Sequence, residues 1–172
     1  MIRALTDEQI RHVFNDEFAD YSVRMIGGAS EPVYLPATEH GQAQLFYRDN
    51  FAASALHEAA HWCIAGQARR TQEDFGYHYL PPPRSASDQL LFFRSELRTQ
   101  ALESLFADQA GVKFVPSADN LESEISEFAK QIDQHRVETL AWMNCRADTR
   151  AKRFYFALGA RRIALGDRPS DK

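Results

Sequence analysis

The chain has 172 residues, of which 44% are hydrophobic and 26% are charged, and its formal net charge at pH 7 is −4. A chain of this size and composition can bury a core without cross-links, so we expect a single domain over residues 1–172. The N-terminal residues lack the apolar region of a signal peptide, and no run approaches the roughly 18 apolar residues of a membrane span. These features predict a cytoplasmic protein with no membrane partner. The two cysteines, Cys63 and Cys145, form no CxxC pair and are expected to be reduced.

The charge is distributed unevenly along the chain. Residues 1–145 carry 12 basic and 21 acidic side chains, whereas residues 146–172 carry 8 and 3. An acidic body argues against direct nucleic-acid binding and favours a cationic substrate. For the basic end two interpretations stay open, namely docking of an acidic partner and a solvated helix face. The basic side chains concerned are Arg146, Arg150, Lys152, Arg153, Arg161 and Arg162.

The first predicted elements are a helix and a small sheet. Thr6–Gln9 has the pattern of a capping box, and apolar residues follow at helical spacing as far as Phe18. Three short strands come next, and the pair Gly27-Gly28 is expected to form a turn. The strand segments are residues 21–25, 32–36 and 44–47.

The next predicted helix, Phe51–Ala65, is apolar nearly all round and is therefore expected to be buried. Asp49 or Asn50 can cap its start, and Gly66 stands where a glycine commonly ends a helix. Residues 67–88 have no clear period and contain three consecutive prolines, which predicts a long loop.

Three more helices are predicted in the second half of the chain. They cover residues 90–110, residues 121–143 after a capping-box-like Asp119–Glu122, and a last helix capped by Asp148 that ends at Leu165. Residues 167–172 are expected to form a flexible polar tail. The predicted class is α+β, dominated by helices, with a small sheet and a zincin-like HExxH metal-binding helix.

The buried helix carries the sequence His57-Glu58-Ala59-Ala60-His61. At about 100° per residue the two histidines lie only about 40° apart, so both imidazoles leave one face and can share one metal ion. In the His-Glu-x-x-His pattern the histidines bind the metal and the glutamate, here Glu58, handles protons. The alternative is a pair of core histidines bonded to backbone carbonyls.

A third protein ligand has to come from another segment. In the predicted helix 90–110, Glu96, Gln100 and Glu103 share a face opposite an apolar stripe. This face either is exposed to solvent or turns towards the histidines and supplies a carboxylate. Glu96 is the first candidate and Glu103 the second. His78 in the loop is a further candidate, although a lone loop histidine is more often solvated.

Two histidines and one carboxylate suit either ferrous-iron oxygen chemistry or zinc hydrolysis. The sequence contains no His-x-Asp, which argues against the iron oxygenases built on a double-stranded β-helix. Two alternatives stay open beside an oxygenase. One is a small zinc peptidase or metal-dependent ribonuclease with Glu58 as general base, and the other is a metal that only holds the helices together.

Several segments together resemble the bacterial elongation factor P hydroxylase family. Within them, His61-Trp-Cys-Ile-Ala-Gly66 and Asp74-Phe-Gly-Tyr77 are far more specific than the His-Glu-x-x-His pattern alone. Residues 126–172 resemble the family only in being helical. In chain order the segments are Glu31–Ala37, Ala53–Gly66, Ala68–Arg70, Asp74–Tyr77 and Asp119–Glu122.

The resemblance implies a non-haem iron enzyme that hydroxylates the lysine of elongation factor P after that lysine has received a β-lysyl group. It implies Fe(II) as the cofactor, with zinc as a substitute, and molecular oxygen and elongation factor P as partners. It also implies His57 and His61 as ligands, and the segment Ser95–Ala101 as the source of the carboxylate. The family's fold is described as closer to a metal-binding ribonuclease and zincin-like arrangement than to other hydroxylases.

In this interpretation Glu58 orients a metal-bound water or attracts the substrate ammonium. The loop Phe75–Arg84, with two tyrosines and three prolines, either forms the rim of a substrate channel or is a simple surface connection.

Overall fold

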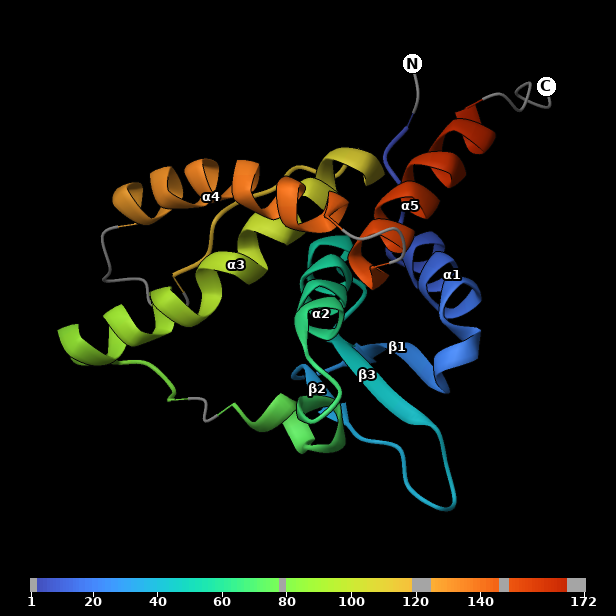
Figure 1. The fold of residues 1–172 in the computed structure, drawn as a ribbon, viewed down its shortest axis with the longest axis horizontal. Helices are drawn as coiled ribbons and strands as arrows, with labels where there is room; N and C mark the ends of the chain where they lie inside the picture. Colours follow the sequence, from blue (N-terminus) through green and yellow to red (C-terminus); the bar gives the residue numbers. More distant parts are fainter. Residues whose placement is uncertain (1–2, 78–79, 119–124, 146–148, 167–172) are drawn as a thin grey trace.

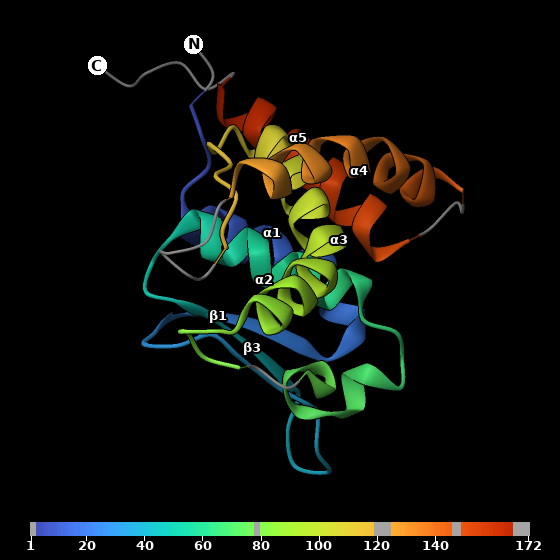
Figure 2. The same cartoon turned by 90° about the vertical axis from the view of Figure 1, so that its left-hand side faces the viewer.

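The computed structural model describes residues 3–77, 80–118, 125–145 and 149–166. Its helices are stacked over one face of a small sheet (Figures 1 and 2), which confirms the helix-dominated class with a small sheet. The elements are α1 (Asp7–Glu17), η1 (Ala19–Tyr21), β1 (Val23–Ala29), β2 (Val33–Leu35), β3 (Ala43–Arg48), α2 (Ala52–Ile64), η2 (Arg69–Thr71), η3 (Glu73–Gly76), α3 (Ala86–Ala110), α4 (Ser126–Asn144) and α5 (Arg150–Gly166), where η marks a 3₁₀ helix.

Some predictions fall outside these described ranges. They are the loop histidine His78, the capping box at Asp119–Glu122, the Asp148 cap, the basic residue Arg146 and the tail 167–172.

The sheet has three strands in the order β1-β3-β2. The central strand β3 pairs in parallel with β1 and antiparallel with β2, and Leu45 lies opposite both Met25 and Tyr34. The three predicted strands are therefore confirmed within a few residues of their expected bounds. The capping box of α1 is confirmed too, because Thr6 and Gln9 each accept a hydrogen bond from the other's backbone N–H.

The predicted turn at Gly27-Gly28 is wrong, because β1 continues through both glycines to Ala29. The register with β3 shifts between Ile26 and Ala29, and Gly28 has a φ of 83°, so the pair forms an irregularity within the strand. A Cβ at Gly27 would lie only 2.5 Å from Cζ of Tyr47. The glycine is thus required because the Tyr47 side chain crosses the strand here.

Helix α2 lies between the sheet and the helices α3 and α5 (Figures 1 and 2). Most of its side chains are buried, including Leu56 and Trp62, which confirms the predicted buried helix. The Trp62 ring packs against the rings of Phe14 and Phe18 at centroid distances of 5.2 and 4.6 Å. This packing holds the helix that carries the two histidines in a fixed position relative to α1.

The predicted caps of α2 are wrong. The N-cap is Phe51, which has no capping side chain, while Asp49 adopts a left-handed φ of 47°. Ser54, inside the first turn, accepts a hydrogen bond from the backbone N–H of Arg48 at 2.9 Å. At the other end the chain leaves the helix at Ala65 with an extended ψ of 122°, so the exit does not use a left-handed Gly66.

Helix α3 begins four residues earlier than predicted. Its cap is Ser85, whose hydroxyl accepts from the backbone N–H of Asp88 at 3.1 Å, and it ends before Gly111, which has a φ of 70°. The first turn, residues 86–89, contains no large apolar side chain, so the apolar helical period starts only at Leu90. The loop before it also contains η2 and η3, which periodicity did not predict.

One large hydrophobic cluster contains side chains from the helices and from all three strands, with Phe14, Leu45, Leu56, Phe106 and Phe154 fully buried. None of the helices in the described ranges is both long and apolar enough to cross a membrane.

Candidate metal centre

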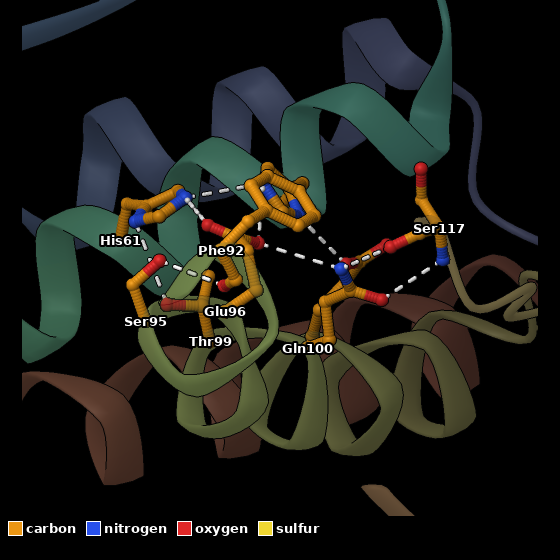
Figure 3. A network of polar contacts seen from close by, with 9 residues as sticks. His61, Phe92, Ser95, Glu96, Thr99, Gln100 and Ser117 are labelled. Carbon is orange, nitrogen blue, oxygen red and sulfur yellow. Dashed lines mark hydrogen bonds and ion pairs between the residues drawn. The ribbon is translucent and has the colours of Figure 1, made fainter. Parts of the chain in front are cut away.

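The side chains of His57 and His61, on α2, meet that of Glu96, on α3. Figure 3 shows His61 and Glu96 turned towards each other. The two Nε2 atoms are 3.1 Å apart. One carboxylate oxygen of Glu96 lies 3.5 Å from Nε2 of His57, and the other lies 3.3 Å from Nε2 of His61. Three groups from two helices therefore converge on one point.

The geometry of these three groups fits a metal ion. Two ligand nitrogens that each lie about 2.1 Å from one ion, at roughly 90–110° to one another, are separated by about 3.0–3.4 Å. The observed separation of the Nε2 atoms, 3.1 Å, is within this interval. Two unprotonated nitrogens so close would repel each other, so a proton or a cation has to lie between them.

A carboxylate on α3 fixes which nitrogen of His57 faces this point. Nδ1 of His57 is 2.8 Å from Oε2 of Glu103. Because an ionised carboxylate only accepts hydrogen bonds, Nδ1 is the donor and Nε2 is left to face Glu96. On the second imidazole, Nδ1 of His61 has a longer contact of 3.5 Å with the hydroxyl of Thr99.

Glu96 is itself held in place by Gln100 (Figure 3). The Gln100 amide group donates to Oε2 of Glu96 at 3.4 Å and to the carbonyl of Ser117 at 2.8 Å, and its oxygen accepts from the N–H of Ser117 at 2.9 Å. The amide is thus bonded at both ends to one backbone residue, which leaves its remaining N–H for the carboxylate.

The charges around the site shift two pKa values strongly. Burial by itself lowers the pKa of His57, but the adjacent carboxylates, first Glu103 and then Glu96 and Glu58, raise it to about 10. Burial alone would raise the pKa of Glu96, but the attraction and hydrogen bond of His61 bring it down to about 2. In the metal-free protein at neutral pH, His57 is therefore cationic and Glu96 anionic.

Glu58 is also buried, with 8% of its surface exposed, and no residue in the described part of the chain donates a hydrogen bond to its side chain. Burial raises its pKa, against the opposing attraction of His57 and His61. A buried carboxyl group that is free to gain or lose a proton beside two histidines is suited to acid–base chemistry.

Two aromatic side chains, Phe75 and Tyr77, lie beside the His61 ring. The Phe75 ring is 6.3 Å from the His61 ring and stacks on Tyr34 at 4.2 Å, and the Tyr77 ring is 5.9 Å from His61. Asp74 and Phe75 both have positive φ, at 46° and 56°, which is unusual for residues other than glycine. The Asp74 carboxylate accepts from the N–H of Tyr34 at 2.8 Å and so helps to hold this conformation.

The structure decides between several alternatives that the sequence leaves open. The polar face of α3 turns inwards, so the interpretation as an exposed helix side is wrong. Glu96 lies at the meeting point of the Nε2 atoms, whereas Glu103 binds the opposite side of the His57 ring. The ring nitrogens contact side chains and each other, so the pair is not held by backbone carbonyls in the described structure.

Thr99 was not predicted at the site, and Gln100 and Phe75 were predicted only as members of a helix face and of a loop, without a contact of their own. The signal for the first two was present in the sequence, because they lie at helical spacing from Glu96 and Glu103 on the same face. Phe75 is part of the Asp74–Tyr77 motif, but only the folded loop brings its ring to His61.

Comparison with known proteins identifies the family of this chain. A protein of Haemophilus influenzae with the name elongation factor P lysine hydroxylase is 44% identical to this chain over 116 residues. These residues are 66% of this chain and 65% of that protein's length. The sequence profile of the elongation factor P hydroxylases matches residues 13–161. The chain therefore belongs to the elongation factor P hydroxylase family.

Proposed function

We propose that this protein is an iron-dependent hydroxylase that acts on the β-lysylated lysine of translation elongation factor P. The observation that carries the proposal is the convergence of His57, His61 and Glu96 in a chain of this family. The printed name of the H. influenzae relative supports the same substrate. Such an activity belongs in the cytoplasm, where translation takes place.

In this proposal His57, His61 and Glu96 would hold one Fe(II) ion. Two histidines from one helical turn joined by a carboxylate from another helix make a zincin-like arrangement, and imidazole and carboxylate ligands suit iron as well as zinc. When bound, iron supplies the activation of molecular oxygen that hydroxylation of an unactivated carbon requires. The reaction replaces one C–H bond by C–O–H, and a reductant delivers two electrons so that the second oxygen atom leaves as water.

The charge of the site favours a cationic substrate. Three buried carboxylates, Glu58, Glu96 and Glu103, surround two imidazoles. A divalent ion bound by neutral imidazoles balances two of the negative charges and leaves one. An ammonium group of a modified lysine is complementary to that remaining charge, which we assign to Glu58.

Two parts of the chain then act directly on the substrate. Glu58 binds the ammonium group or moves a proton, because its carboxyl has no other partner in the described structure and burial raises its pKa. Phe75 and Tyr77 form one wall of the entry to His61 and exclude water from the reacting carbon. This assignment makes Phe75 and Tyr77 part of the rim of the proposed substrate channel.

Mass spectrometry of the substrate tests the proposal. Iron-loaded protein, oxygen and a reductant are incubated with β-lysylated elongation factor P, and we expect the gain of one oxygen atom on the modified lysine. His57→Ala and His61→Ala should abolish the gain, and Glu58→Gln should slow it about 100-fold or more. Glu73→Gln, which changes an exposed side chain on η3, is the matched control and should leave the rate unchanged. No mass gain with the wild-type protein would rule the proposal out.

One observation favours a second candidate. Glu58, which has no hydrogen-bond donor among the described residues and lies beside two histidines, could also serve as the general base of a metal hydrolase. Zinc-dependent cleavage of casein or RNA that is lost in Glu58→Gln, together with no hydroxylation, would establish that alternative.

A further inference from the structure

One face of α3 carries four polar side chains that are buried. Glu96, Thr99, Gln100 and Glu103 follow each other at spacings of three, one and three residues and are 7%, 2%, 1% and 8% exposed. Burying polar groups is unfavourable unless each has a partner. Each of the four has a partner at the candidate metal centre, so this face of the helix is built for that centre.

Among these four, Glu103 has the shortest contact with a candidate ligand. Its oxygen lies 2.8 Å from Nδ1 of His57, compared with 3.5 Å between Thr99 and Nδ1 of His61. The contact is on the far side of the ring from Glu96, so Glu103 cannot reach the metal position through this oxygen while the contact lasts. It therefore acts on the ion only through His57.

We infer that Glu103 is a positioning residue that fixes the proton on Nδ1 of His57 and strengthens Nε2 as a metal ligand. A carboxylate at one nitrogen of an imidazole fixes the tautomer and the ring orientation and increases the basicity of the other nitrogen. His61 receives only a long contact from a neutral hydroxyl, so the two histidines are unequal ligands. The inference rests on the metal centre of the proposed function and adds a role for a residue outside the ligand set.

The contact also links two helices. His57 belongs to α2 and Glu103 to α3, and Glu96 joins the same two helices seven residues earlier in α3. The His57 ring is thus held between two carboxylates of one helix, one on each nitrogen. Loss of Glu103 leaves the ring free to turn about its side-chain bonds, whereas loss of Glu96 removes a ligand.

Cobalt(II) binding provides the test, measured by competition with a chromophoric chelator. We expect Glu103→Ala to weaken binding about 10- to 100-fold. Glu103→Gln is nearly isosteric, and its amide oxygen can still accept from Nδ1, so its affinity should lie between those of the wild type and of Glu103→Ala. In the iron-loaded form, Glu103→Gln should also raise the reduction potential, because it removes a negative charge that supports the oxidised ion.

A matched control is available on α4, where Glu138 contacts Nδ1 of His135 at 2.9 Å on the surface. Glu138→Gln removes a glutamate–histidine contact of the same kind and should leave cobalt affinity unchanged. The inference is overturned if Glu103→Ala and Glu103→Gln both bind cobalt as tightly as the wild type while His57→Ala does not bind it. It is also overturned if Glu96→Ala keeps wild-type affinity, because Glu103 would then itself be a ligand.

The cobalt affinity of the wild-type protein tests the metal centre of the proposed function separately from the role of Glu103. If the wild-type protein binds no cobalt, the metal centre itself is wrong and the role of Glu103 falls with it. If Glu103→Ala does not fold, the isosteric Glu103→Gln still tests the inference through its affinity and its reduction potential.

Discussion

His57 lies between two carboxylates, with Glu103 at Nδ1 and Glu96 at Nε2. Without a metal ion, a proton on this ring is stabilised from both sides, and the pKa rises from 6.5 to about 10. A metal ion and this proton compete for the same nitrogen, since only an unprotonated Nε2 can bind the ion. Metal binding at the site should therefore depend on pH through the protonation of His57.

Metal affinity should increase with pH as a result. Because His57 has to lose its proton at any pH below about 10, apparent affinity should rise about tenfold for each pH unit as pH approaches 10. Competition titrations with cobalt(II) at several pH values measure this. An affinity that is the same at pH 7 and pH 9 would contradict the assignment of Nε2 as a ligand.

The same proton stabilises the metal-free fold. The stability of that fold should therefore decrease as pH rises, whereas metal affinity should increase. A raised pKa contributes folding free energy that is fully present below 6.5 and is lost as pH rises through 10. Thermal denaturation of the metal-free protein should therefore show a melting temperature that falls across this interval. In His57→Ala this component of the fall should be absent.

Much of the candidate site could be predicted from sequence at the level of single residues. Periodicity alone places His57 and His61 on one face of a helix, and it places Glu96 and Glu103 on one face of another. It does not say which carboxylate faces which nitrogen, because that depends on how α2 and α3 pack. The Phe75 ring was unpredictable for the same reason, since a loop with two left-handed residues brings it to His61.

At the scale of elements, the crossing of Tyr47 over β1 shapes the sheet. The Tyr47 ring lies against Gly27, and its hydroxyl donates to the Asp7 carboxylate at 2.8 Å. Asp7 is the first residue of α1, so this one side chain joins β3, β1 and α1. The space at Gly27 is therefore filled by the ring, and a side chain there would displace it.

Gly27→Ala should destabilise the protein by about 1–3 kcal/mol, the usual range for overpacking, because the added methyl group would clash with the Tyr47 ring. Chemical denaturation measures the change in the free energy of unfolding. Gly41→Ala is the matched control, because a Cβ at Gly41 meets nothing within 4 Å, and it should change stability by less than about 0.5 kcal/mol. Equal stability of both variants would mean that Tyr47 does not cross the strand at this glycine.

The helices and strands were largely predictable, whereas their ends and irregularities were less so. The capping box at Thr6 is a local signal, and the structure agrees with it. The glycine pair in β1 gives the same local signal as a turn, and only the distant Tyr47 makes it part of a strand. Asn50 is a good capping residue by type, but the N-cap of α2 is Phe51, which follows Asp49 in its left-handed conformation.

At the scale of the whole molecule, the basic end of the chain holds the histidine helix in place. Arg150 at the start of α5 donates to the carbonyls of Trp62 and Ala65 at 2.9 and 2.5 Å, and its guanidinium lies 4.5 Å from the Trp62 ring. Arg153 forms ion pairs with Glu17, the last residue of α1, and with Asp20 in η1. These arginines bind within the chain, so neither a solvated face nor a partner surface describes them.

Arg150→Ala should therefore destabilise the protein by about 2–3 kcal/mol, through the loss of charged hydrogen bonds to two carbonyls at the end of α2. Arg150→Lys should recover little of this, because an ammonium group cannot bond both carbonyls in the fork geometry of a guanidinium. Thermal denaturation checks both variants. Arg161→Ala, an exposed arginine on the same helix, is the control, and an equally large loss in that variant would point to net charge instead.

The most direct test of the central claim is an anomalous diffraction measurement at the iron edge, on crystals grown with Fe(II) in the absence of oxygen. Our account predicts one peak per chain, in contact with Nε2 of His57, Nε2 of His61 and a carboxylate oxygen of Glu96, with Glu103 still bonded to Nδ1 of His57. A peak at any other position, or a metal-free site with saturating iron, would contradict it.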